Sequence, residues 1–295
     1  MTAVRKGVIL AAGLGTRMLP ATKAVPKEML PIVDKPLVQY AVEEAVAAGI
    51  DHIVFVIADG KEAIAEHFSL RTRADAYARE RGEAELIERV CGPASLARFD
   101  YVRQDEPRGI AHAVACAREF VEGEPFALIF PDDIITGARS CMAQLVDVHQ
   151  RDGGTVIAVQ RVRREEVPQY GIVDPEGEGN PVRLRGVVEK PAAADAPSDL
   201  GIVGRYILSE TIFAHIDRIP PGKNGELQIT DAIASQIAAG ERVSGYAYEG
   251  VRHDTGRPLG YLVANVAVAL ERGDLAGPLA ERLRTLLAPE GPQTP

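Results

Sequence analysis

The sequence lacks an excess of positive charge and a long hydrophobic run. Its formal net charge is −9 over 295 residues, whereas nucleic-acid-binding proteins present a basic surface, so we expect no nucleic-acid polymer as a partner. No apolar run approaches the roughly 18–20 residues that span a bilayer, and Arg5-Lys6-Gly7 leads straight into a short apolar run without a secretory signal pattern. We therefore expect a cytoplasmic protein without a membrane partner.

Cysteine is also scarce. Only Cys91, Cys116 and Cys141 occur, and their spacing is neither paired nor typical of a metal site. This usage fits a reduced compartment. The apolar share of 46% and the charged share of 25% are ordinary for a globular protein, and the length allows one large α/β domain or two small ones.

A glycine-rich segment follows the apolar run Val8–Leu10, which is typical of a buried parallel strand. Gly13 and Gly15 allow a tight turn and a close approach of the backbone to a ligand. The amide N–H groups of such a turn form a concave anion site, and Arg17 and Lys27 add positive charge. The segment predicts a polyphosphate site.

Two common phosphate motifs do not fit this chain. A dinucleotide fingerprint needs a third glycine where Met18 stands, and Pro20 disfavours a helix running straight on. A Walker-type loop needs Ser or Thr after Gly-Lys, but Asn224 follows Gly222-Lys223. For Gly-Leu-Gly alone, a surface turn with incidental basic residues remains an alternative.

Residues 11–31 read Ala-Ala-Gly-Leu-Gly-Thr-Arg-Met-Leu-Pro-Ala-Thr-Lys-Ala-Val-Pro-Lys-Glu-Met-Leu-Pro and are followed by Asp34-Lys35-Pro36-Leu37. This stretch resembles the signature of the sugar nucleotidyltransferases, and residues 21–28 resemble the branch that uses UTP. The resemblance implies an α/β, Rossmann-like fold with a mixed central sheet flanked by helices and a sugar-side β extension. It also implies that UTP and α-D-glucose 1-phosphate give UDP-glucose and pyrophosphate by a Mg²⁺-dependent in-line displacement without a covalent intermediate.

The resemblance also implies roles for individual residues. Arg17, Lys27 and Lys190 would be the catalytic cations. The residues implied in nucleotide binding are Ala11, Ala12, Gly13, Gly15, Glu28, Gln104 and Gly109. The primary amide of Gln104 offers a donor and an acceptor to the edge of uracil. Ala111 stands where this branch usually has glycine, and His112 is interpreted as a residue in the first turn of a helix.

Two aspartates are expected to bind the metal. Pro131-Asp132-Asp133 follows the apolar run Phe126–Phe130, and a carboxylate at the carboxyl end of a central strand points into the ligand crevice. An ordinary turn aspartate is the alternative. The resemblance favours Asp132, leaves a share for Asp133 open, and implies Asp254 as the second ligand, although Asp254 or Thr255 could instead cap the last helix.

The sugar side is expected around Gly171 and Glu189-Lys190-Pro191. In isolation, a solvated Glu-Lys pair is the better interpretation. The resemblance assigns Glu189 and Gly171 to the hexose and Lys190 to the sugar phosphate. The segments 204–206 and 226–233 also match and are interpreted mainly as scaffold.

Apolar runs and helical periodicities alternate in the first half of the chain, which predicts a parallel sheet with crossover helices. The predicted strands are 8–11, 52–58, 99–103 and 126–130, and the helices are 37–48, 61–68, 72–90 and 112–120. The second half predicts a mixed or antiparallel extension, with strands at 155–162, 171–174, 184–189, 202–208 and 243–248 and helices at 230–239 and 259–270.

We expect a single domain over residues 1–290, followed by a flexible tail at 291–295. Its nucleotide-binding half would span about 1–135, its sugar-binding half about 136–258, and its C-terminal helical part about 259–290. The family resemblance implies a homo-oligomer, a dimer or a tetramer. The alternatives are another sugar-1-phosphate nucleotidyltransferase, such as one that uses dTTP, and a non-catalytic nucleotide-sugar sensor on the same fold.

Overall fold

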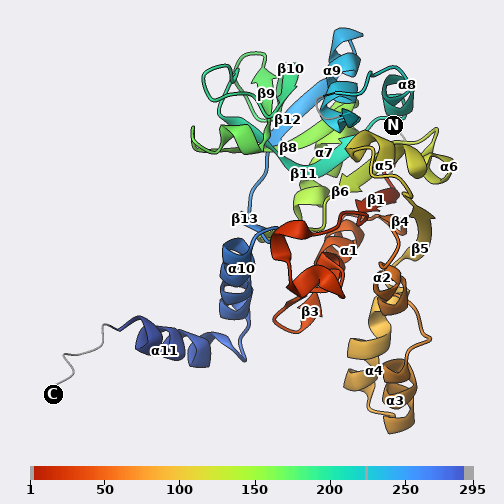
Figure 1. Cartoon of the computed structure of the whole chain (residues 1–295), viewed down its shortest axis with the longest axis vertical. Helices are drawn as coiled ribbons and strands as arrows, with labels where there is room; N and C mark the ends of the chain where they lie inside the picture. The colour runs from red at the N-terminus through yellow and green to blue at the C-terminus, as the bar shows by residue number, and fades with distance from the viewer. Residues whose placement is uncertain (1–2, 223–224, 289–295) are drawn as a thin grey trace.

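The structure is a computed structural model that describes residues 3–222 and 225–288, and Figure 1 shows its architecture. The tail predicted at 291–295 lies outside these residues. Among the helices of the described ranges, none combines the length and the apolar character needed to cross a membrane.

A nine-stranded mixed sheet forms the centre of the molecule (Figure 1). Its spatial order is β5-β4-β1-β6-β11-β8-β12-β10-β9. The strands are β1 (Lys6–Leu10), β4 (His52–Ile57), β5 (Arg98–Arg103), β6 (Phe126–Ile129), β8 (Thr155–Arg161), β9 (Gly171–Pro175), β10 (Val182–Glu189), β11 (Leu200–Leu208) and β12 (Val243–Ala247).

The direction of the strands changes in the middle of this sheet. Strands β5, β4, β1 and β6 are parallel, and Val8 of β1 lies opposite Val54 of β4 and Leu128 of β6. Strand β11 then runs antiparallel to both β6 and β8. The expected α/β fold with a mixed sheet is confirmed, because a parallel half formed by β5, β4, β1 and β6 continues into an extension that contains antiparallel pairs.

Helices cover both faces of the sheet, and each face has its own apolar core. One core contains Phe55, Ile129 and Met142 and lies under α1 (Leu37–Ala47), α2 (Glu62–His67) and α7 (Cys141–Asp152). The other contains Leu128, Tyr206 and Phe213. It lies under α5 (Ile110–Cys116), α6 (Arg118–Val121), α8 (Ile212–Ile216) and α9 (Ile229–Ala238). Burial on two faces explains why the central strands are almost uninterrupted apolar runs.

Two small antiparallel ribbons lie beside the main sheet. One pairs β2 (Pro31–Ile32) with β3 (Lys35–Pro36), and the other pairs β7 (Asp133–Thr136) with β13 (Val251–Asp254). In the second ribbon Asp254 lies directly opposite Asp133. This register brings together two aspartate loops that are far apart in the sequence.

The C-terminal helices extend away from the sheet (Figure 1). Helix α10 (Pro258–Glu271) packs on the β2–β3 ribbon, where Tyr261 donates to the carbonyl of Pro31 at 2.5 Å and Asn265 accepts from Val33 N at 2.9 Å. Helix α11 (Ala276–Leu287) contains no buried residue.

Several elements differ from the prediction. The helix predicted over 72–90 is two helices, α3 (Arg73–Arg81) and α4 (Ala84–Cys91), because Gly82 adopts φ +69° and ends the first. The helix predicted over 112–120 is divided into α5 and α6. The sequence analysis did not predict α7, α8 or the two ribbons, and it placed α11 only within a helical part at 259–290. Short 3-10 turns occupy η1 (Thr16–Met18), η2 (Ala21–Lys23), η3 (Lys27–Met29), η4 (Gly92–Ser95) and η5 (Val167–Gln169).

Candidate active site

Three adjoining cavities lie at the carboxyl ends of the parallel strands. Their volumes are about 440, 370 and 240 Å³, and Asp132 lines all of them. Phe130 and Ile110 line both the 440 Å³ cavity and the 370 Å³ cavity, and Arg17 lines both the 440 Å³ cavity and the 240 Å³ cavity. The predicted nucleotide side and the predicted sugar side therefore meet at one carboxylate.

The glycine-rich segment forms one wall of these cavities. Ala12, Gly13 and Leu14 line the second cavity together with Lys27. Gly15 has φ +65° and begins the short turn η1, which carries Arg17. A glycine is favoured here because that backbone conformation strains other side chains. The turn thus places backbone amides and two cations around one space, as the sequence predicted.

Lys27 connects this wall to the metal loop. Its ammonium donates to Asp132 Oδ2 at 2.8 Å. Burial alone would lower the pKa of Lys27, but the neighbouring charges of Asp132 and Glu28 outweigh it and raise the pKa. Burial likewise pushes the pKa of Asp132 upward, but Lys27 reverses the effect and holds that pKa below its ordinary value. The pair is therefore charged at neutral pH.

Gln104 and Gly109 lie together at the far end of the second cavity. Gln104 Nε2 donates to the Gly109 carbonyl at 3.2 Å and lies 3.0 Å from His112 Nδ1. These contacts orient the amide. Gly109 has φ +103°, and a Cβ there would lie 2.5 Å from the carbonyl oxygen of Leu227. The packing of the 226–228 segment therefore requires glycine, and His112 is in the first turn of α5 as predicted.

Two of the residues predicted to bind nucleotide lie behind the cavity wall. Ala11 is fully buried and its N–H donates to Val56 O at 2.8 Å, so this amide is already used in the sheet. Glu28 is 1% exposed and accepts from Lys61 Nζ at 2.7 Å, and its other oxygen, Oε1, has no hydrogen-bond partner among the described residues. Burial raises the pKa of Glu28. Neither residue lines the three cavities.

The aspartates differ in their partners. Asp133 is buried and accepts from Arg252 Nε at 2.7 Å. Burial raises the pKa of Asp133 to about 6, although Arg252 acts in the opposite direction. Asp254 accepts from the Gly256 N–H at 2.9 Å and its side chain is 46% exposed. It is not the cap of α10, because that helix begins after Arg257.

The space between Asp132 and Asp254 fits a cation. A Cβ on Gly256 would lie 3.2 Å from Asp254 Oδ1 and 3.6 Å from Asp132 Oδ2, so the glycine leaves this space open. Within residues 3–222 and 225–288 there is no cluster of three or more His, Cys, Asp or Glu ligands. Two carboxylates completed by phosphate oxygens are a typical Mg²⁺ environment. Asp133, which is turned to Arg252, fits this role less well.

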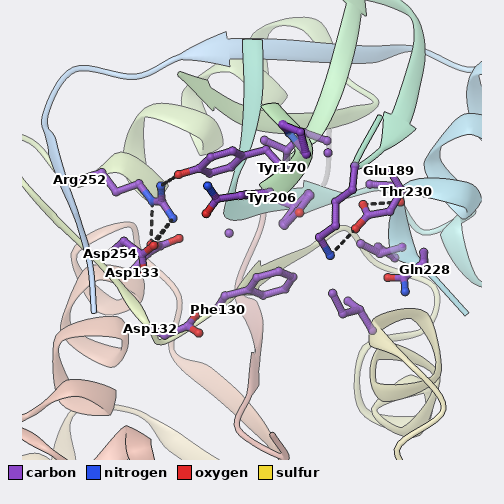
Figure 2. A pocket seen from close by; sticks show the side chains of 18 of the residues that line it. Phe130, Asp132, Asp133, Tyr170, Glu189, Tyr206, Gln228, Thr230, Arg252 and Asp254 are labelled. Carbon is purple, nitrogen blue, oxygen red and sulfur yellow. Dashed lines mark hydrogen bonds and ion pairs between the residues drawn. The ribbon is translucent and has the colours of Figure 1, made fainter. Parts of the chain in front are cut away.

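The predicted sugar side is centred on Glu189 (Figure 2). Glu189 Oε2 accepts from Thr230 Oγ1 at 3.1 Å, and Oε1 pairs with Lys190 Nζ at 2.8 Å. Lys190 has φ +43°, a rare conformation for a residue with a side chain. Gly171 faces the same cavity, and a Cβ there would lie 3.1 Å from both Ile202 Cδ1 and Thr230 Cγ2.

The sequence analysis missed several lining residues. Arg252 reaches between Asp133 and Tyr170 and donates to the Tyr170 hydroxyl at 3.0 Å (Figure 2). Its position two residues before Asp254 on a strand, and so on the same face, was the available signal. Thr230 is the first residue of the predicted helix 230–239; it lies in the first turn of α9, and its side chain donates to Glu189. The other lining residues not predicted to bind substrate include Phe130, Gln169, Tyr170, Tyr206, Gln228 and Arg257.

Known proteins resemble this chain over nearly its whole length. The family model "Nucleotidyl transferase" matches residues 6–271. The UTP–glucose-1-phosphate uridylyltransferase of Bacillus subtilis is 44% identical over 291 residues, which cover 98% of this chain and 99% of that protein. The corresponding enzyme of Staphylococcus epidermidis is 41% identical over 287 residues, 97% of this chain and 99% of that protein.

Solved structures agree with these matches. A UDP-glucose pyrophosphorylase complexed with UDP-glucose superposes with a TM-score of 0.82 at 37% identity, covering 91% of this chain and 100% of that one. A UTP-bound enzyme of the same name from Acinetobacter baumannii superposes with a TM-score of 0.85 at 33% identity, covering 96% of this chain and 99% of that one. With the family model spanning most of the chain and close relatives matching end to end, this chain belongs to the nucleotidyl transferase family.

Proposed function

We propose that this protein is a UTP–glucose-1-phosphate uridylyltransferase, which converts UTP and α-D-glucose 1-phosphate into UDP-glucose and pyrophosphate. The observation that carries the proposal is the junction at Asp132, where a cavity lined by the glycine-rich segment and Gln104 meets a cavity lined by Glu189 and Lys190. The relatives with this activity match over nearly their whole length, which favours UTP over dTTP.

The reaction is an in-line displacement. A phosphate oxygen of glucose 1-phosphate forms a bond to the α-phosphorus of UTP, and the bond from that phosphorus to the oxygen of the departing pyrophosphate breaks. The attacking phosphate is already an anion, so no general base and no covalent intermediate are required. The main obstacle is the repulsion between two polyanions, so catalysis depends on positioning and charge stabilisation.

The chain supplies these effects with separate groups. Arg17 and Lys27 would bind the triphosphate and the charge that develops on pyrophosphate, which is supported by their place in the lining of one cavity beside Asp132. Lys190 would bind the sugar phosphate and Glu189 the hydroxyls of the hexose. Gln104 would pair with the uracil edge. Asp132 and Asp254 would hold Mg²⁺, which when bound supplies positive charge to the phosphate oxygens.

The structure also supports proposals about the number of domains, the location and the oligomeric state of the protein. We propose that residues 1–290 act as one domain, since one sheet spans the nucleotide and the sugar sides. A cytoplasmic location is supported by three free cysteines. A homo-oligomer is supported by α10 and α11, which expose Leu259, Leu262, Val263, Leu286 and Leu287.

The decisive experiment measures pyrophosphate release from UTP with glucose 1-phosphate, with and without Mg²⁺, and repeats it with dTTP and with galactose 1-phosphate. We expect Mg²⁺-dependent release that is fastest with UTP and glucose 1-phosphate. A preference for dTTP would support the thymidylyl alternative. Binding of UDP-glucose without any pyrophosphate release would instead support a sensor.

A further inference from the structure

The segment Phe130–Asp133, which carries Asp132 between β6 and β7, is held by its carbonyl oxygens. The Phe130 carbonyl accepts from Arg205 Nη1 at 2.7 Å, and the Asp133 carbonyl accepts from Arg205 Nη2 at 2.7 Å. The Asp132 carbonyl accepts from both Thr255 N at 2.9 Å and Thr255 Oγ1 at 2.7 Å. Two residues from other elements thus fix three carbonyls of the metal loop.

Arg205 is on β11 beneath this loop and is fully buried. Its guanidinium reaches the carbonyls on either side of Asp132, and its charge is balanced by Glu44 of α1, whose Oε2 accepts from Nη2 at 2.8 Å. The planar fork of an arginine has a fixed geometry. A buried fork that contacts both flanks of Asp132 therefore restricts where the backbone of Asp132 can lie.

Thr255 links the two aspartate loops. It follows Asp254 in the sequence, is 2% exposed, and uses both its N–H and its hydroxyl on the carbonyl of Asp132. The next residue, Gly256, leaves open the space between the two carboxylates. The distance between Asp132 and Asp254 is therefore determined by this contact together with the pairing of Asp254 and Asp133 across β13 and β7.

We propose that Thr255 and Arg205 are positioning residues that hold the Asp132 and Asp254 carboxylates at the separation a divalent cation requires. Neither side chain lines the metal space itself. The inference rests on the proposed function, in which these two carboxylates bind the cation. A preorganised site loses affinity when its supporting contacts are loosened, because geometry within about 0.5 Å determines binding.

The test measures the affinity for UTP by calorimetry, once in excess EDTA and once at saturating Mg²⁺. The affinity at saturating Mg²⁺ divided by the affinity in EDTA is the Mg²⁺-dependent gain. Thr255→Val keeps the shape of the side chain and removes the hydroxyl, and Thr255→Ser keeps the hydroxyl. We expect Thr255→Val to reduce the gain about two- to tenfold, the range for one net hydrogen bond, without a similar change in the affinity measured in EDTA. Thr255→Ser should retain the gain.

Thr155→Val is the matched control. Thr155 is a fully buried threonine at the start of β8, bonded to Gln236 and Ser209, and none of these three residues lines the three cavities around Asp132. It should lower the melting temperature and leave the gain unchanged. Arg205→Lys, which keeps the charge opposite Glu44 but not the fork, should reduce the gain as Thr255→Val does; if it fails to fold, the threonine series decides.

An unchanged gain in Thr255→Val, or an equal loss in Thr155→Val, would overturn the positioning role. The two proposals fail in different ways. If the wild-type protein binds no UTP and releases no pyrophosphate, the proposed function is wrong. If it does both and Thr255→Val has a normal Mg²⁺-dependent gain, only the positioning role is wrong.

Discussion

At the residue scale, cations and carboxylates are already paired around the cavities. Lys27 pairs with Asp132, Arg252 with Asp133, and Lys190 with Glu189. Each pair places a positive charge near the expected path of a phosphate. Incoming phosphates can take over the cations, since Lys and Arg bind phosphate as readily as carboxylate. We infer that the pairing of Lys27 changes from Asp132 to the triphosphate when UTP binds.

Removing one member of the Lys27–Asp132 pair tests this assignment. We expect Lys27→Ala and Asp132→Asn each to lower the turnover rate by about 10²–10³ or more at saturating UTP and Mg²⁺, the usual effect of losing a preorganised charge contact. Lys23→Ala is the control, because Lys23 is an exposed lysine of the same segment. Near-normal turnover in either variant, measured by pyrophosphate release, would show that its assigned role is wrong.

The position of a single residue at the site was predictable where that residue belongs to a local sequence motif. Gly15, Lys27 and Gln104 line or support the cavities where the glycine-rich and base-side segments indicated. Arg205 was interpreted as scaffold, because nothing local shows that a guanidinium on a strand contacts the carbonyls of a distant loop. A charged residue inside the otherwise apolar run 202–208 was nonetheless a visible signal of a buried ion pair.

At the element scale, the metal loops depend on the β7–β13 ribbon and on the helix that follows it. Gly260 in the first turn of α10 packs against the carbonyl of Asp254, and a Cβ there would overlap that oxygen. The helix can approach β13 this closely only because residue 260 has no side chain. The position of Asp254 is therefore coupled to the packing of α10 on β2 and β3.

Gly260→Ala should consequently impair activity. The added methyl group must displace either α10 or the backbone of Asp254, so we expect at least a tenfold fall in kcat, of the order expected when a preorganised metal contact is misplaced. Gly277→Ala in α11 is the control: a Cβ there meets nothing within 4 Å, and alanine should stabilise the helix by about 0.5–1 kcal/mol. Equal activity of the two variants by pyrophosphate assay would contradict the coupling.

Helices and strands were predictable where their burial leaves a clear apolar pattern in the sequence. All nine predicted strands correspond to strands of the main sheet, and the long apolar runs 52–58, 126–130 and 202–208 correspond to β4, β6 and β11. The division at Gly82 was missed because helix propensity is high on both sides of it. The ribbon β7–β13 pairs residues 133–136 with 251–254, so its two short strands carry no mutual signal. Helix α7 does have apolar spacing at 141, 142, 145 and 148, and could have been identified.

At the scale of the whole molecule, the C-terminal helices expose several large apolar side chains. Leu262 and Val263 of α10 are 61% and 53% exposed, and Leu286 and Leu287 of α11 are more exposed still. Contiguous exposed apolar surface usually marks an interaction site. In the proposed homo-oligomer, a second copy of the chain would cover this surface.

Introducing charge on the exposed apolar surface of α10 should therefore dissociate the homo-oligomer. We expect the double variant Leu262→Lys with Val263→Lys to reduce the mass measured by light scattering relative to the wild type, because burying two ammonium groups without partners is costly. Leu70→Lys alters another exposed leucine, after α2, and should leave the mass unchanged. A monomeric wild-type protein, or a double variant of unchanged mass, would exclude α10 as the interface.

The continuity of the central sheet has a mechanical consequence. Main-chain hydrogen bonds join β6 to β11 from Phe126–Leu208 to Ile129–Arg205, directly across the proposed boundary between the nucleotide side and the sugar side. We therefore expect the two sides of the cleft to move little relative to each other, because separating them would break these hydrogen bonds. Substrate entry and product release would then depend on movement of the loops above the strand ends.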